Sequence, residues 1–146
     1  MSAFIVRRRV RFEHCDSAGI VFYPRYFAMF NALVEDWFSD ALGYNWGDMH
    51  MRDRRGVPLV DIHTRFHRPC RLGETIALHL TLRRIGRSAI DGSITIVGVQ
   101  DDPGETPRVE TDFTVVFTDF DRMRSARIPE ALLEKMRPYL SAETVR

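Results

Sequence analysis

The chain has few cysteines and no long hydrophobic run. Its 146 residues include two cysteines, Cys15 and Cys70, which lack the Cys-x-x-Cys spacing of a zinc site. We therefore expect reduced thiols, no disulfide framework and no bound metal. The longest stretches without Asp, Glu, Lys or Arg are residues 26–34 and 92–100, nine residues each. Because a membrane-spanning helix needs about 20 apolar residues, we expect no membrane association. The N-terminus lacks the pattern of a secretory signal, which predicts a cytoplasmic protein.

A strong excess of charge of one sign is also lacking. Lys and Arg together number 21 and Asp and Glu 20, a net charge of +1, and Lys135 is the only lysine. A chain this close to neutral has no overall attraction to nucleic acid, so we expect no nucleic-acid partner. The Gly-x-Ser-x-Gly elbow of serine hydrolases and the glycine-rich loops of nucleotide-binding proteins are absent. We therefore expect neither a serine mechanism nor a nucleotide cofactor.

The apolar residues that are present suffice for a sizeable core. The chain is 45% hydrophobic and contains ten Phe, and no linker divides it, which predicts a single domain over residues 1–146. Residues 4–12 alternate between apolar and charged side chains, as a half-buried strand does. Apolar residues then recur at spacings of three and four between Pro24 and Gly43. This pattern predicts a long, largely buried helix over residues 24–42.

Turn residues separate four further stretches that are rich in β-branched and aromatic residues. We interpret these stretches as antiparallel strands over residues 57–67, 74–85, 88–101 and 108–120. Pro129 then precedes a short helix predicted over residues 130–139. The order of elements predicts an α+β domain in which an antiparallel sheet wraps around one long central helix. Because the sheet covers the helix on one side only, we also expect an oligomer.

One carboxylate, Asp16, lies in a turn-prone segment a few residues before the predicted helix. The first N–H groups of a helix, here near Tyr23, have no intrahelical partner and favour negative charge. They would polarise a carbonyl group whose oxygen accepts from them, and a carboxylate opposite would attack that carbonyl or activate a water. Alternatively, Asp16 only forms a local Asx-turn with backbone donors.

Residues 12–26, FEHCDSAGIVFYPRY, closely resemble the signature of the 4-hydroxybenzoyl-CoA thioesterase family. That signature reads aromatic-x-x-x-Asp-x-x-Gly, then two aliphatic residues, an aromatic residue, Tyr or His, and Tyr three positions later. Members of this family have the hotdog fold, which the predicted element order matches. The resemblance extends over about residues 7–139. The residue after the Asp is often Pro in the 4-hydroxybenzoyl-CoA enzymes and is Ser17 here, which weakens the substrate assignment more than the reaction assignment.

The resemblance implies a role for three residues of this motif. Asp16 falls on the family's catalytic carboxylate, which acts as a nucleophile or as a general base toward water. Tyr23 falls where a backbone N–H at the helix N-terminus polarises the thioester carbonyl. Gly19 falls on the turn glycine that lets the backbone pass close to the site.

The resemblance also implies substrate-binding residues, each with a plainer alternative. Arg87 and Ser88 resemble a basic–Ser pair that meets the phosphates of coenzyme A, and the alternative is a solvated turn. His63 lies on a strand that contributes to the acyl pocket, and the alternative is an ordinary polar or interfacial histidine. Phe22 and Tyr26 would line an aryl pocket or belong to the core.

We therefore expect an acyl-CoA thioesterase without a cofactor, which hydrolyses a small acyl-CoA to the free acid and CoA. An aromatic acyl group of the hydroxybenzoyl type is the first choice, and a short- or medium-chain aliphatic group is its competitor. The expected assembly is a homodimer, or a tetramer of two dimers, with the site across a dimer interface.

Three other interpretations remain open. A hotdog dehydratase would need a histidine placed differently from His14. A non-catalytic module that binds acyl thioesters would keep the fold and lose turnover. A nucleophilic pair of Cys15 and His14 is the weakest alternative, because no third group orients it.

Overall fold

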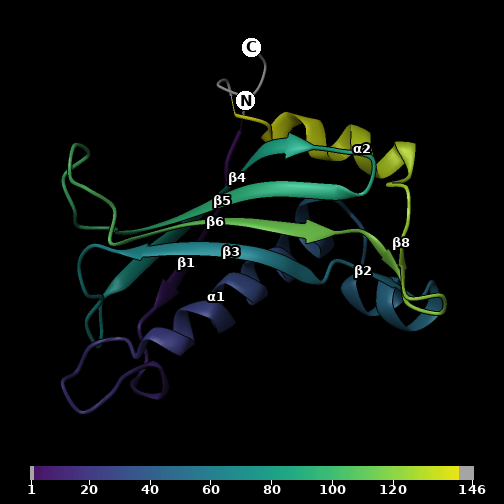
Figure 1. Cartoon of the computed structure of the whole chain (residues 1–146). Helices are drawn as coiled ribbons and strands as arrows, with labels where there is room; N and C mark the ends of the chain where they lie inside the picture. Colours follow the sequence, from purple (N-terminus) through teal and green to yellow (C-terminus); the bar gives the residue numbers. More distant parts are fainter. Residues whose placement is uncertain (1, 142–146) are drawn as a thin grey trace.

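A five-stranded antiparallel sheet forms the frame of the molecule, and a long helix crosses one of its faces (Figure 1). The computed structural model describes residues 2–141. The strands lie in the order β1-β4-β5-β6-β3. Their bounds are Phe4–Arg9 (β1), Leu59–Phe66 (β3), Thr75–Ile85 (β4), Ala89–Gly98 (β5) and Val109–Val116 (β6). The predicted hotdog architecture of α+β class is therefore confirmed.

Helix α1 covers Tyr23–Asp36 and continues as a π-helical turn, η2, over Trp37–Ala41. Pro24 occupies its first turn, and Gly43 follows it with a φ of +69°. Both agree with the predicted helix boundaries, because proline needs no N–H partner there and glycine adopts the left-handed conformation without strain. The π-helical end was not predicted, because residue spacing does not separate a π-turn from an α-turn.

The smaller elements frame the two ends of the sheet. They are η1 (Phe12–His14), η3 (Asp48–Arg52), β2 (Arg55–Gly56), β7 (Thr118–Asp119), β8 (Arg124–Ser125), α2 (Glu130–Met136) and η4 (Arg137–Tyr139). Strands β2, β7 and β8 form a separate three-stranded sheet. The segment 44–56, interpreted from sequence as irregular, thus contains a π-helical turn and a short strand. The predicted strand over residues 108–120 is divided into β6 and β7.

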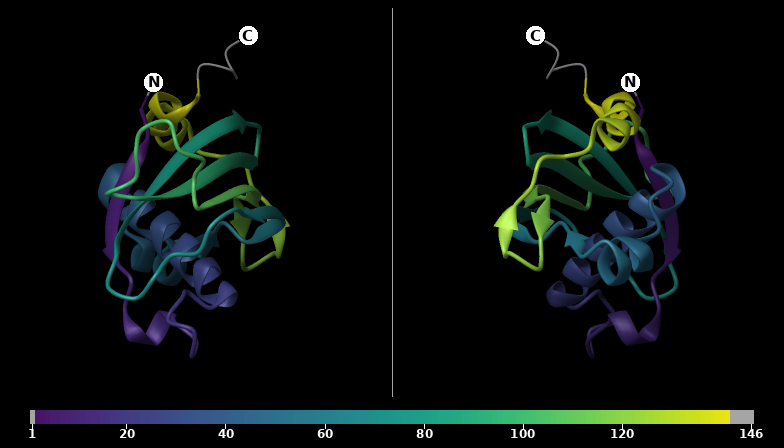
Figure 2. Two further views of the ribbon diagram at one scale, coloured as in Figure 1. Left: turned by 90° about the vertical axis from the view of Figure 1, so that its left-hand side faces the viewer. Right: turned by 90° about the vertical axis from the view of Figure 1, so that its right-hand side faces the viewer.

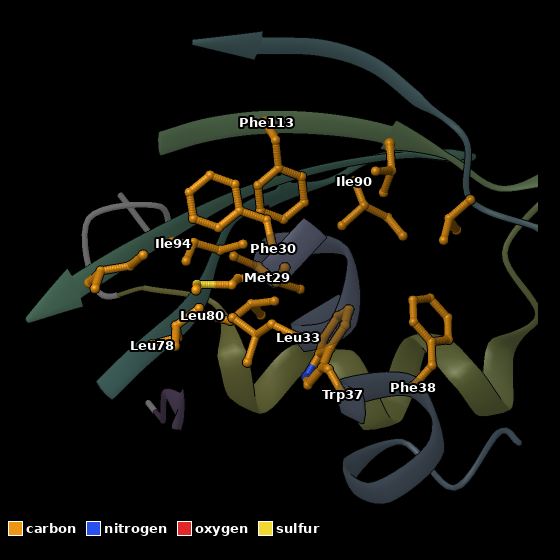
Figure 3. Packing of buried hydrophobic residues seen from close by; sticks show 14 of the residues in the cluster. Met29, Phe30, Leu33, Trp37, Phe38, Leu78, Leu80, Ile90, Ile94 and Phe113 are labelled. Atoms are coloured by element: carbon orange, nitrogen blue, oxygen red, sulfur yellow. The ribbon is translucent and has the colours of Figure 1, made fainter. Parts of the chain in front are cut away.

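The core lies between α1 and the inner face of the large sheet (Figures 2 and 3). Met29, Phe30 and Leu33 of α1 point at the sheet, where they meet Leu80 of β4 and Phe113 of β6. Residues of β5 are alternately buried and partly exposed, so the sheet has one apolar face and one face open to solvent. The opposite side of α1 is uncovered within the described protomer, where Arg25, Ala28, Asn31 and Glu35 are exposed. The helix is therefore less buried than predicted, because one sheet covers only one of its sides.

Candidate active site

The loop between η1 and α1, residues 15–22, holds Asp16 at the surface; we call it the motif loop. The Asp16 N–H donates to the carbonyl oxygen of Ile20 at 3.1 Å, which closes the loop. Asp16 Oδ1 accepts from the N–H of Ala18 at 2.9 Å, an Asx-turn. No atom of residues 2–141 hydrogen-bonds to Oδ2, and the side chain is exposed. The Asx-turn therefore leaves one carboxylate oxygen open to a substrate or a water.

Gly19 gives the motif loop its sharp bend. Its φ of +75° lies in the left-handed region that favours glycine. Its carbonyl oxygen accepts from the N–H of Leu72 at 2.9 Å, and the N–H of Val21 donates to the carbonyl oxygen of Cys70 at 2.9 Å. The motif loop is thus docked on residues 67–74, the segment that leads into β4.

The N-terminus of α1 presents one backbone donor that has no acceptor. Phe22 is the N-cap residue, and its side chain forms no capping hydrogen bond. Its N–H donates to the carbonyl oxygen of His14, and its carbonyl oxygen accepts from the N–H of Arg25, both at 2.9 Å. Pro24 has no N–H. The N–H of Tyr23 has no acceptor among residues 2–141. This N–H and the helix dipole together favour an anion or a polarised carbonyl oxygen at this point.

An open cleft of about 290 Å³ lies beside this helix terminus. Its lining comprises Ile20, Val21, Tyr23, Tyr26, Phe66, His67, Arg68 and Pro69. The ring of Tyr26 packs against that of Phe66 with centroids 5.7 Å apart, and its hydroxyl oxygen accepts from the N–H of Cys70 at 3.4 Å. Burial raises the pKa of Tyr26. Tyr26 is therefore a core residue that also borders the cleft. Phe22 is half exposed and packs against Tyr23 outside the lining.

A buried arginine fixes the segment on which the motif loop is docked. Arg108 is 8% exposed and donates two hydrogen bonds to Glu74, both at 3.0 Å. It donates two more to Asp101, at 2.8 and 3.0 Å, and one to the Pro69 carbonyl oxygen at 2.9 Å. Hydrogen bonds from Arg108 lower the pKa of Glu74 and hold that of Asp101 at about 2. The charge network therefore joins the segment before β4 to the hairpin between β5 and β6.

A second cavity, of about 260 Å³, lies between α1 and the inner face of β3; we call it the α1–β3 cavity. Its wall comes from α1, from residues 46–62 and from β5 and β6, and is mostly aromatic and aliphatic. Asn31 and Leu59, both exposed, lie at its mouth. Trp46, His50 and Phe120 also line it. Sequence reasoning missed these three residues, because the segment 44–56 has no periodicity and Phe120 was assigned to the end of a strand.

The other candidate residues lie elsewhere. His63 is exposed on the outer face of β3, paired with Asp112 of β6 and on the opposite side of the sheet from the α1–β3 cavity. Arg87 and Ser88 form the turn between β4 and β5. The length of β4, about 33 Å at 3.3 Å per residue, separates that turn from the motif loop of the same protomer. Within one protomer, the turn at Arg87 and Ser88 is therefore far from Asp16, and His63 faces away from the α1–β3 cavity.

Neither a metal cluster nor a Cys–His pair is found among the described residues. Within residues 2–141, no group of three His, Cys, Asp or Glu side chains could hold a metal ion. Cys15 Sγ donates to the carbonyl oxygen of Arg11 at 3.5 Å, and His14 Nδ1 accepts from the Arg11 N–H at 2.8 Å. Both side chains are thus engaged with the backbone and not with each other. None of the described helices has the length and apolar character to cross a membrane.

A model of the thioesterase-like superfamily matches residues 10–136, most of the chain. The chain belongs to this superfamily. The prediction of a thioester hydrolase is thereby confirmed, whereas the narrower resemblance to the 4-hydroxybenzoyl-CoA thioesterase family stays a prediction. No curated protein sequence matches the chain.

Solved structures of low sequence identity share the fold of this thioesterase. The 1,4-dihydroxy-2-naphthoyl-CoA thioesterase from Synechocystis has a TM-score of 0.81 and 17% identity, with 92% of this chain and 96% of that chain covered. A Staphylococcus aureus protein in complex with CoA has a TM-score of 0.81 and 15% identity, covering 94% and 83%. A gentisyl-coenzyme A thioesterase has a TM-score of 0.76 and 18% identity, covering 89% and 99%.

Proposed function

We propose that this thioesterase hydrolyses a small aromatic acyl-CoA, with Asp16 as the nucleophile or general base. The observation that carries the proposal is the unpartnered N–H of Tyr23 at the N-terminus of α1, next to a loop that presents a free carboxylate oxygen. A carbonyl oxygen bound to this N–H would be polarised by a fixed donor, as in an oxyanion hole.

In the general-base route, the Asp16 carboxylate takes a proton from a water, and the hydroxide adds to the thioester carbon. The negative charge that develops on the carbonyl oxygen is stabilised by the Tyr23 N–H and the dipole of α1. The tetrahedral intermediate then expels the CoA thiolate, which recovers a proton, and the free acid leaves. In the nucleophilic route, an Asp16 oxygen adds to the thioester carbon and the C–S bond breaks, which expels the CoA thiolate to be protonated. Water then hydrolyses the resulting mixed anhydride to the free acid and the Asp16 carboxylate.

The aromatic acyl group is supported by the ring-lined α1–β3 cavity and by the names of two structural neighbours, which are thioesterases of naphthoyl-CoA and gentisyl-CoA. The neighbour in complex with CoA supports an acyl-CoA as substrate. A short- or medium-chain aliphatic acyl group would also contact the apolar wall of this cavity. A module that binds acyl thioesters without hydrolysing them would have the same cavity.

A homodimer would complete the site. Strand β3 lies at one end of the sheet, its outer edge has no partner among the described residues, and Leu59 and Phe66 near its two ends are 52% and 49% exposed. The unpaired backbone groups of an edge strand are a template for another strand. In an antiparallel pairing of two copies of β3 centred between Ile62 and His63, Leu59 would lie opposite the partner's Phe66. The mouth of the α1–β3 cavity would then face the partner's α1 N-terminus, and a tetramer of two such dimers remains compatible.

The proposed dimer also indicates which residues would bind the nucleotide end of CoA. The Arg87 carbonyl oxygen accepts from the N–H of Ile128 at 2.9 Å, and the Ser88 carbonyl oxygen accepts from the N–H of Phe117 at 2.8 Å. The turn therefore lies beside the segment that carries Arg124 and Arg127. In the dimer, this arginine-rich end of one protomer would lie near the motif loop of the other. Its arginines would then bind the CoA phosphates.

The experiment that tests the proposal compares wild type with Asp16→Asn on a panel of aryl- and alkyl-CoA thioesters. Because Asn retains the hydrogen bond from Ala18 and the side chain is exposed, we expect the variant to fold with unchanged stability. We expect kcat to fall by roughly 100-fold or more while KM changes little. An Asn variant with wild-type turnover would exclude the mechanism, and a wild type that prefers alkyl thioesters would replace the aromatic substrate by the aliphatic one.

A further inference from the structure

Apart from the indole N–H of Trp46, the polar groups on the wall of the α1–β3 cavity belong to three side chains. Five rings line it, those of Phe27, Phe30, Trp46, Phe113 and Phe120. Asn31 lies at the exposed mouth. The Thr111 hydroxyl donates to the His63 carbonyl oxygen at 3.1 Å and lies 2.7 Å from the Thr64 hydroxyl, so its hydrogen is already used within the sheet. His50 is the third polar residue.

The hydrogen bond of His50 fixes which ring nitrogen carries the proton. Nδ1 lies 2.8 Å from the carbonyl oxygen of Trp46. A carbonyl oxygen only accepts, so Nδ1 must be the protonated nitrogen. In the neutral imidazole, Nε2 then carries a lone pair and is an acceptor. No atom of residues 2–141 hydrogen-bonds to Nε2.

The surroundings of His50 hold its ring in place. The centroid of its ring lies 4.5 Å from the Trp46 ring and 5.8 Å from the Phe120 ring. Gly56 lies directly against this group: a Cβ there would come within 2.4 Å of Phe120 and 3.0 Å of His50 Nε2. His50 is also part of the π-helical turn η3, and such turns are frequent at functional sites. An acceptor without a partner among residues 2–141 is thus held beside Gly56, on a side chain that lines a mostly apolar wall.

We propose that His50 is a specificity-determining residue that accepts a hydrogen bond from a hydroxyl group on the acyl part of the substrate. The inference rests on the proposed function. The enzyme should then prefer hydroxylated aryl-CoA thioesters over the same carbon skeleton without the hydroxyl. A methoxy group should not replace the hydroxyl, because it brings an oxygen to Nε2 but no donor. Burying Nε2 against an acyl group that cannot donate leaves this acceptor unsatisfied, which disfavours such substrates.

The test measures kcat/KM for benzoyl-CoA thioesters that carry hydrogen, hydroxyl or methoxy at the 3 or the 4 position. Wild type should prefer the best hydroxylated substrate to its methoxy and unsubstituted counterparts by about tenfold or more. His50→Phe keeps an aromatic ring and removes the acceptor, so the ratio should fall to about one. His50→Gln retains an acceptor at a similar reach and should keep part of the preference. The matched control is His79→Phe, which changes a histidine on the outer face of β4 and should leave the ratio unchanged.

The outcomes separate this inference from the proposed function. Equal rates on all three substituents, or a preference that persists in His50→Phe, would overturn the role of His50 while the thioesterase activity stands. If no thioester is hydrolysed, the proposed function fails. In that case the dissociation constants of wild type for the same hydroxylated and methoxylated thioesters, measured by calorimetry, still decide whether the cavity recognises the hydroxyl: a ratio near one would reject it.

Discussion

Gly19 and Gly104 have equally open surroundings and differ in backbone conformation. A Cβ built at either position meets no atom within 4 Å, but only Gly19 has a positive φ, +75°. A side chain in the left-handed region costs roughly 1–2 kcal/mol. A substitution at both positions therefore measures the cost of the left-handed backbone at Gly19 without a steric contribution.

We expect Gly19→Ala to lower the free energy of unfolding by about 1 kcal/mol, because alanine is strained at this φ. Gly104→Ala should change it by less than about 0.5 kcal/mol. Urea unfolding of both variants and of wild type measures the difference. Equal effects at the two positions would show that the left-handed conformation of Gly19 is not what stabilises the motif loop.

Arg108 acts between elements, because its five hydrogen bonds join the segment before β4 to the hairpin between β5 and β6. Glu74 and Asp101 both have lowered pKa values in the folded chain, that of Asp101 falling from 3.8 to about 2. A carboxyl group whose pKa is lowered by folding contributes stability above its ordinary pKa, and this contribution is lost as the pH falls through the folded value. The fold should therefore lose stability between about pH 4.5 and pH 2.

Replacing Arg108 by Met should reduce this pH dependence and weaken the fold at neutral pH. Loss of one partner from a buried charge network costs about 3 kcal/mol. Without Arg108 the pKa values of both carboxyl groups should rise toward their ordinary values, although the N–H groups of Gly98 and Arg71 still lower them. Denaturant unfolding from pH 7 to pH 2 measures both effects. A variant with the same slope of stability between pH 4.5 and pH 2 as wild type would show that other carboxyl groups cause the acid sensitivity. Arg124→Met, at an exposed arginine of β8, serves as the control.

In the proposed dimer, each active site contains residues of both protomers. Asp16 of one chain would act on an acyl group held in the cavity of the other. Asn31→Trp adds bulk at the exposed mouth of that cavity without disturbing the core. Asp16→Asn removes the carboxylate. Each variant on its own should therefore be inactive as a homodimer.

A heterodimer of the two variants, purified through two different affinity tags, should regain about half of the wild-type activity per dimer. One of its two sites would combine an intact Asp16 with an open cavity, and the other would combine both defects. If each site lay within a single protomer, both sites of the heterodimer would carry one defect and no activity would return. The steady-state rate of the purified heterodimer distinguishes these arrangements.

Much of the architecture was predictable from local patterns. Alternation of apolar residues identified β1, and spacings of three and four identified α1, because these periods decide which side chains face a core. Turn residues and β-branched or aromatic stretches identified the strands that became β4 and β5. The free N–H of Tyr23 followed from the position of Pro24 at the start of the helix. The role of Asp16 rests on the motif that surrounds it and stays a prediction.

Tertiary structure decided what the local patterns leave open. The two-residue period of β3 places Asp61, His63 and Arg65 on one face, but only the pairing of β3 with β6 turns that face away from α1. The distance of Arg87 from the motif loop follows in the same way from the antiparallel path of β4 and β5. The α1–β3 cavity and the acceptor of His50 arise where segments 44–58 and 113–120 meet, far apart in sequence. Local periodicity records the environment of each residue along its own element, whereas a cavity is made by the elements that long-range packing brings around it.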